Sequence, residues 1–173
     1  MPNTAQLVTI QPGAIGADYV SLTPKVKAWL LTNNAKFVSR YIARRSSIGK
    51  IITREEIAWL HKNGIAIVLN YEGSANDLNL GAPGGVANGA WSRQFVASLG
   101  YPADAPLVVS VDTDVYAGNL GTAVAYVRGF FSQAGAHQPA IYGDSDILIT
   151  SHGWPRFGNA EIRDYLGKHR DVY

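Results

Sequence analysis

The sequence predicts an α/β fold, a (β/α) barrel of the TIM type that is short and incomplete. Short apolar runs rich in β-branched residues alternate with longer segments of helical period, which is the pattern of βα units around a parallel sheet. Five to six such units are clear in the sequence. A closed eight-stranded barrel usually takes about 250 residues, whereas this chain has 173. We therefore expect one domain over residues 1–173, several strands short of a full barrel.

The apolar runs give the strands, and capping residues mark where the first helices begin. Thr23 and Pro24 suit the N-cap and first residue of one helix. Thr53 and Glu56 have the spacing of a capping box for the next, which Gly64 ends. The predicted strands cover residues 16–20, 36–42, 65–72, 107–115 and 140–143.

The second half of the chain is less regular. A polar, glycine-rich loop is expected over residues 73–85, followed by helices over 86–99 and 120–133. Trp154, before a proline, marks a sixth strand or its loop. Residues 159–173 are polar and predict a divergent tail or one amphipathic helix.

Composition excludes several classes of site and partner. The net charge is +2, and the 15 Lys and Arg residues are spread along the chain, so nucleic acid is not expected as a partner. There is no cysteine, which excludes disulfides, thiolate zinc sites and cysteine nucleophiles. The four histidines lack metal-ligand spacing, and we expect no metal or organic cofactor. We find neither a secretory signal nor an apolar run long enough to span a membrane.

Acidic residues gather at the predicted strand ends. Strand alternation places Asp112 and Asp114 on the barrel-interior side of the fourth strand, and Glu72 on the same side of the third. Asp18 lies where the first strand ends. In a parallel barrel these ends open onto the active-site face. Carboxylates at close range hold one protonated acid beside an ionised partner, which is what glycoside cleavage requires.

Other residues near the strand ends are candidates for substrate binding. Tyr41, Tyr142 and Trp154 offer flat rings for stacking on sugars, and Asn70 offers an amide. Arg40 is a further candidate, and it is also the residue that would make the cluster structural by pairing with Asp112 and Asp114. Asp and Glu at strand ends also often cap the following helix, which is the structural alternative for Asp18.

The remaining motifs are weak. Residues 81–85, GAPGG, lack the spacing and the lysine of a phosphate-binding loop. There is no G-x-S-x-G nucleophile elbow. Arg44 and Arg45 suit a solvated loop, or contact with an anionic polymer.

Five short motifs in order carry a family resemblance. They are GADYVS, KFVSRYI, NYE, LVVSVDTD and AIYGD, and together they span about residues 16–154. The chain resembles the glycoside-hydrolase-like domain-of-unknown-function family 1906, a TIM-barrel relative of lysozymes with an Asp-x-Glu pair on the fourth strand. The resemblance implies that Asp18, Glu72, Asp112 and Asp114 match the family's acidic residues. Asp114 stands where the lysozymes have Glu, one methylene longer.

The resemblance implies a glycoside hydrolase that acts on a cell-wall amino-sugar polymer such as peptidoglycan, at the wall or outside the cell. Asp114 or Glu72 would donate a proton to the leaving oxygen, and Asp112 would stay ionised. Two alternatives stay open. One is an inactive carbohydrate-binding or wall-anchoring module. The other is an assembly component, in which the incomplete barrel is completed by a second copy in an oligomer or by a partner chain.

Overall fold

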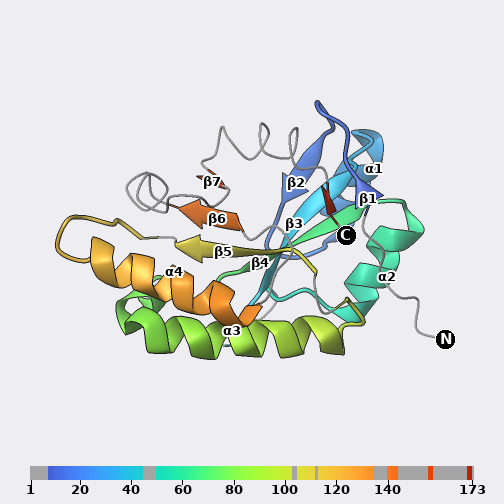
Figure 1. The fold of residues 1–173 in the computed structure, drawn as a ribbon. Coiled ribbons are helices and arrows are strands. Elements are labelled where there is room, and N and C mark those ends of the chain that lie inside the picture. Colours follow the sequence, from blue (N-terminus) through green and yellow to red (C-terminus); the bar gives the residue numbers. More distant parts are fainter. Residues whose placement is uncertain are drawn as a thin grey trace.

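A computed structural model describes residues 8–44, 50–102, 105–111, 113–134, 140–143, 156–157 and 171–172 (Figure 1). The strands are β1 (Val8–Thr9), β2 (Gly16–Asp18), β3 (Phe37–Ile42), β4 (Ala66–Tyr71), β5 (Leu107–Val111), β6 (Ala140–Gly143), β7 (Arg156–Phe157) and β8 (Asp171–Val172). The helices are α1 (Pro24–Thr32), α2 (Arg54–Lys62), the 3-10 turn η1 (Asp77–Leu80), α3 (Gly81–Ser98) and α4 (Leu120–Ala134).

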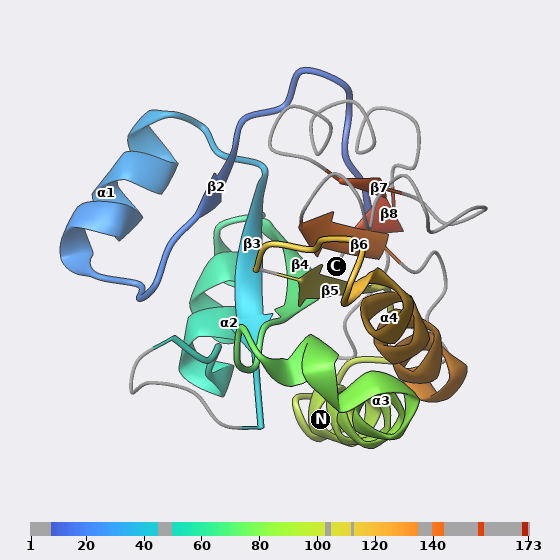
Figure 2. The ribbon, with the colours of Figure 1, turned by 90° about the vertical axis from the view of Figure 1, so that its left-hand side faces the viewer.

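The main sheet is parallel and curled into part of a barrel. Its strand order is β2-β3-β4-β5-β6-β7, and each strand pairs in parallel with the next one along the chain. The helices lie on the outer side of the curve (Figure 2). The predicted βα units are therefore present as a half-barrel, and the described residues form no pairing between β7 and β2 that would close it.

A small second sheet covers the amino end of the inner face. Val8 pairs with Val172 and Thr9 with Asp171, in antiparallel register. Beside it, buried Ile10 packs with Ala66. Strand β8 contacts β4 as well. Within the segment 159–173, predicted as a divergent tail or a helix, residues 171–172 form strand β8. Strand β1 lies in a segment for which no element was predicted.

The hydrophobic core lies between the sheet and the outer helices. Alternate residues of the central strands face it, and they are fully or almost fully buried. The strand residues that face the helices are Val38, Ile42, Ile67, Leu69, Leu107, Val109 and Val111, and the helices contribute Leu30, Leu60, Val96, Val127 and Phe130. No helix in the described ranges is both long and apolar enough to cross a membrane.

The first two helices begin where the capping residues predicted. Thr23 Oγ1 accepts a hydrogen bond from the amide of Val26 at 3.2 Å, and Pro24 opens α1. Thr53 Oγ1 accepts from the amide of Glu56 at 3.2 Å. These bonds satisfy amides that the helix itself leaves without partners.

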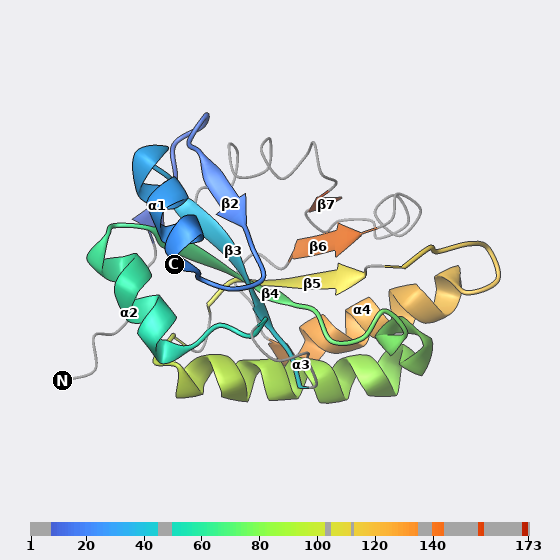
Figure 3. The same ribbon diagram turned by 180° about the vertical axis from the view of Figure 1, so that it is seen from behind.

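Helix α3 is longer than predicted, because the glycines assigned to a loop are packing residues. The helix begins at Gly81, not at Val86. It runs beside α4 below the sheet (Figure 3). A Cβ atom on Gly85 would lie 1.9 Å from the Tyr126 carbonyl oxygen, and one on Gly89 would lie 2.2 Å from that of Phe130. Only glycine lets the two backbones approach this closely.

We expect Gly85→Ala to destabilise the protein, because the added methyl would overlap the backbone of α4. Overpacking of this kind typically costs about 1–3 kcal/mol. Gly121→Ala in α4 is the matched control, since no atom lies within 4 Å of the added Cβ, and it should be neutral or stabilising by up to about 1 kcal/mol. Urea denaturation of both variants checks this. Equal stabilities would show that the helices do not pack as described.

Arg40 lies on the helix-facing side of the sheet and is fully buried. Its Nε atom donates to Glu56 of α2 at 2.5 Å, and Nη2 donates to the same carboxylate at 3.2 Å. Nη1 donates to the Tyr19 carbonyl at 2.6 Å, and Nη2 to the carbonyls of Val20 and Lys50 at 3.3 and 3.2 Å. The guanidinium thereby links three segments: helix α2, the residues that follow β2, and the residue Lys50 before α2.

The expectation that Arg40 binds substrate, or pairs with Asp112 and Asp114, is corrected by this position. Strand alternation groups Arg40 with Val38 and Ile42, which face the helices, and not with the opposite face. Its charge is balanced by Glu56 below the sheet.

Arg40→Met should destabilise the fold by about 3–5 kcal/mol, because it leaves the Glu56 carboxylate buried without its cation. Arg54→Met is the control. Arg54 is exposed and bonds only the carbonyl of Ser98 among the described contacts, so its loss should cost no more than about 1 kcal/mol. Chemical denaturation monitored by circular dichroism compares the two, and a loss at Arg40 as small as that at Arg54 would contradict the role given to it.

Candidate functional site

The candidate site occupies the inner face of the sheet at the carboxyl ends of the strands. The predicted alternation of the fourth strand is confirmed, because Leu107, Val109 and Val111 are buried under the helices while Val108 and Ser110 are half-buried on the other face. Directly paired residues of neighbouring strands point to the same face. The register thus sets Asp18 beside Ser39, Tyr41 beside Asn70 and Ser110 beside Tyr142.

Asp18 and Tyr41 are joined directly. The Tyr41 hydroxyl donates a hydrogen bond to Asp18 Oδ2, across neighbouring strands. Partial burial raises the pKa of Tyr41 above its usual value, and the hydrogen bond to Asp18 with the negative charges of Asp18 and Glu72 raises that pKa further. Tyr41 therefore stays protonated and acts as a donor, and it holds one oxygen of the Asp18 carboxylate in place.

Glu72 forms an ion pair that the sequence did not predict. Lys50 Nζ bonds to Glu72 Oε1, and the two side chains are 24% and 20% exposed. The same ammonium lies 4.3 Å from the centroid of the Tyr41 ring, a distance at which a cation is attracted to an aromatic face. Lys50 thus joins Glu72 to the pair formed by Asp18 and Tyr41.

The backbone around Lys50 is fixed to β3. Ile51 forms an isolated parallel bridge with Tyr41, and the Ile52 amide donates to the Tyr41 carbonyl at 2.9 Å. The Lys50 carbonyl accepts from Arg40 below the sheet. The short apolar pair at residues 51–52, just before the Thr53 cap, was the signal in the sequence that this segment returns to the sheet.

Asn70 and Ser110 form a second polar contact on the same face. Ser110 Oγ donates to Asn70 Oδ1 at 3.0 Å, which joins β4 to β5. Asn70 is buried, with 6% of its surface exposed, so its amide is held in one orientation. Tyr142 on β6 is half-buried beside Ser110 in the strand register.

Asp114 does not lie on a strand. Strand β5 ends at Val111 and not at residue 115 as predicted, so alternation does not orient the Asp114 side chain. Asp114 is exposed, and its carbonyl accepts from Asn119 Nδ2 at 3.4 Å. Asp112 and Trp154, both predicted site residues, lie outside the described residues.

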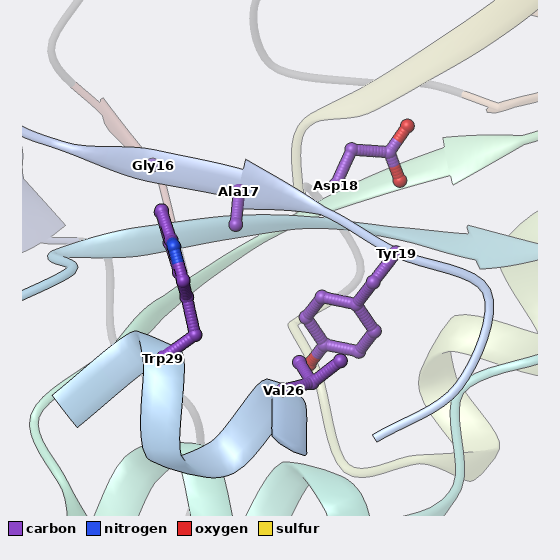
Figure 4. A pocket seen from close by; sticks show the side chains of 6 residues that line it. All are labelled: Gly16, Ala17, Asp18, Tyr19, Val26 and Trp29. Atoms are coloured by element: carbon purple, nitrogen blue, oxygen red, sulfur yellow. The ribbon is translucent and has the colours of Figure 1, made fainter. Parts of the chain in front are cut away.

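A separate hollow of about 340 Å³ lies between β2 and α1 (Figure 4). Tyr19 and Val26 point into the space between strand and helix, whereas the Asp18 carboxylate points away from α1. The hollow is thus on the helix-covered side of β2 and apart from the carboxylates. Its lining residues are Gly16, Ala17, Asp18, Tyr19, Val26 and Trp29.

The arrangement suits acid–base chemistry on a hydroxylated ligand. Asp18 is held by the Tyr41 hydroxyl, and Glu72 is held by the Lys50 ammonium. Asn70 and Ser110 add polar groups able to bond sugar hydroxyls. Within the described part of the chain, no three His, Asp or Glu side chains are grouped to hold a metal ion.

Several solved structures share this fold. The Tat-secreted protein Rv2525c of Mycobacterium tuberculosis is similar in two crystal structures. The complex with HEPES has a TM-score of 0.66 and 24% identity and covers 82% of this chain and 80% of that one. The complex with L-tartrate has a TM-score of 0.65 and 26% identity, and the match covers 87% of this chain and 72% of that one.

A more distant solved structure with this fold is an autolysin. The modular autolysin LytC of Streptococcus pneumoniae has a TM-score of 0.58 and 12% identity, over 79% of this chain and 34% of that one. The likeness shows a shared fold. No curated protein matches the sequence.

The sequence also matches a family model over residues 27–164, which is most of the chain. The model describes an Rv2525c-like, glycoside hydrolase-like domain. It agrees with the resemblance stated from the strand-end motifs, which is confirmed. This chain belongs to the Rv2525c-like family of glycoside hydrolase-like domains.

Proposed function

We propose that this domain hydrolyses a cell-wall amino-sugar polymer such as peptidoglycan. The observation that carries the proposal is the set of linked side chains Asp18, Tyr41, Lys50 and Glu72 at the carboxyl ends of β2, β3 and β4. Enzymes built on this type of barrel hold their catalytic groups at that face. The family name and the autolysin among the structures with this fold suggest the glycan class.

Hydrolysis needs one carboxylic acid and one carboxylate. The acid protonates the leaving oxygen as the glycosidic bond breaks, and the carboxylate stabilises positive charge at the anomeric carbon or accepts a proton from the attacking water. Glu72 suits the second role, because its ion pair with Lys50 fixes the carboxylate in place. Asp114 is then the better candidate for the proton donor, and Asp112 is a candidate for the ionised partner. Asp18, fixed by Tyr41, orients the attacking group.

Glycan binding without turnover is the second candidate function. It is favoured by the position of Asp114, which is exposed on the loop after β5 and not held at a strand end. Proton donors must reach the leaving oxygen to within a fraction of an ångström, and an aspartate is one methylene shorter than a glutamate. A domain that kept the polar face but lost this reach would anchor to the wall.

The place of action follows from the same proposal. A cell-wall substrate requires that the domain act outside the cytoplasm. The similar protein from Mycobacterium tuberculosis is described as Tat-secreted, which supports an extracytoplasmic location here.

Replacement of the proposed catalytic carboxylates tests the enzyme. Asp114→Asn and Glu72→Gln should each lower the release of reducing sugar from purified peptidoglycan by about 100-fold or more. Glu55→Gln is the matched control, because Glu55 lies exposed in the first turn of α2, outside the site, and its activity should equal that of the wild type. Thermal melting confirms folding of each variant.

The outcomes separate the two functions. Release of reducing sugar that is unchanged in both variants would rule out these catalytic assignments. Sedimentation of the wild-type protein with cell walls, without release of sugar, would favour the binding module.

A further inference from the structure

The carboxyl end of the sheet carries both signs of charge, on different segments. Among the described residues, the acids Asp18, Glu72 and Asp114 follow β2, β4 and β5. The cations Arg44 and Lys50 both belong to the segment between β3 and α2. Arg44 is exposed, and a quarter of the Lys50 side chain is exposed. The site therefore contains a cation, Lys50, although the catalytic chemistry proposed above uses only acids.

Lys50 is held in place but retains donor capacity. An ammonium group has three N–H donors. Glu72 Oε1 accepts from Lys50, and the face of the Tyr41 ring attracts the cation without accepting a conventional hydrogen bond. The bond from Arg40 to the Lys50 carbonyl and the pairing of Ile51 with Tyr41 fix the backbone. Among the described contacts, two N–H donors are therefore left, and the Lys50 side chain is 24% exposed, so a ligand can reach it.

We propose that Lys50 is a specificity-determining residue, which binds a carboxylate carried by the glycan. The inference rests on the proposed function, and it narrows the substrate class to acidic amino-sugar polymers over neutral ones such as chitin. Lys50 already bonds one carboxylate, and a lysine ammonium can bridge two. A ligand carboxylate bound at Lys50 would also set the register of the sugar chain along the inner face.

Two parts of peptidoglycan offer this chemistry. The lactyl group of muramic acid has a free carboxylate where the peptide has been removed, and the stem peptide has its own carboxylates. The shared chemistry is a carboxylate attached to the glycan, and ligands with and without peptides distinguish the two sources.

Calorimetric titration with matched glycans tests the preference in the wild-type protein. The ligands are peptide-free peptidoglycan strands, the same strands with their carboxyl groups reduced to alcohols, and strands that keep their peptides. Reduction should weaken binding about five- to tenfold, as expected for one partly exposed charge pair. Strands with peptides should bind like the reduced strands if Lys50 binds the lactyl carboxylate, and more tightly than both peptide-free ligands if it binds a peptide carboxylate.

Two lysine variants assign the preference to this residue. In Lys50→Met, which keeps an apolar side chain of similar length, the affinities for acidic and reduced strands should become equal within about twofold. Lys50→Arg should retain the preference. Lys27→Met is the matched control, because Lys27 also lies over an aromatic ring, 5.2 Å from that of Trp59, but on α1 outside the site. It should behave as the wild type.

The results separate this inference from the proposed function. Equal affinity of the wild-type protein for all three ligands would overturn the role of Lys50 while glycan binding stood. A preference for acidic over reduced strands that survives in folded Lys50→Met would also overturn the role of Lys50. Absence of binding to all three ligands would overturn the proposed function, and this inference with it. Should Lys50→Met not fold, the wild-type comparison and Lys50→Arg still decide.

Discussion

The buried pair of Arg40 and Glu56 is the constraint on which the geometry of the site depends. A buried ion pair often adds little net stability compared with apolar packing, because both charges lose their hydration. In this protein the ion pair instead fixes the positions of neighbouring backbone segments. The planar guanidinium donates to Glu56 and to the carbonyls of Tyr19, Val20 and Lys50. Those carbonyls lie next to Asp18 and within Lys50 itself, so the groups on the inner face take their positions from an arginine on the outer face.

Strand alternation predicted much of the site, because a strand has a fixed period of two. The common face of Asn70 and Ser110, and the burial of Leu107 and Val109, follow from it. The same rule applied to the second strand would have placed Arg40 under the helices, where it is found. Asp114 illustrates the limit, since residues 111–115 continue the alternating pattern after the strand has ended.

The features that were missed depend on contacts between distant segments. The glycines at residues 81–85 favour a loop by local preference, and the close approach of α4 at Gly85 explains why glycine belongs to a helix there. Strands β1 and β8 pair residues from opposite ends of the chain, which no local pattern could reveal. Lys50 follows the same logic, because its partners Tyr41 and Glu72 lie on two strands that bracket it in the sequence.

The carboxylates of the proposed site differ in how firmly they are held, and this difference fits their roles. Asp18 and Glu72 are fixed by Tyr41 and Lys50, so they resist movement. Among the described residues, no side chain bonds the carboxylate of Asp114, and its loop leaves it exposed to solvent. A proton donor must follow the leaving oxygen as the bond breaks, and must then regain a proton. A carboxyl group on a loop can do both, whereas one locked to an ammonium can do neither.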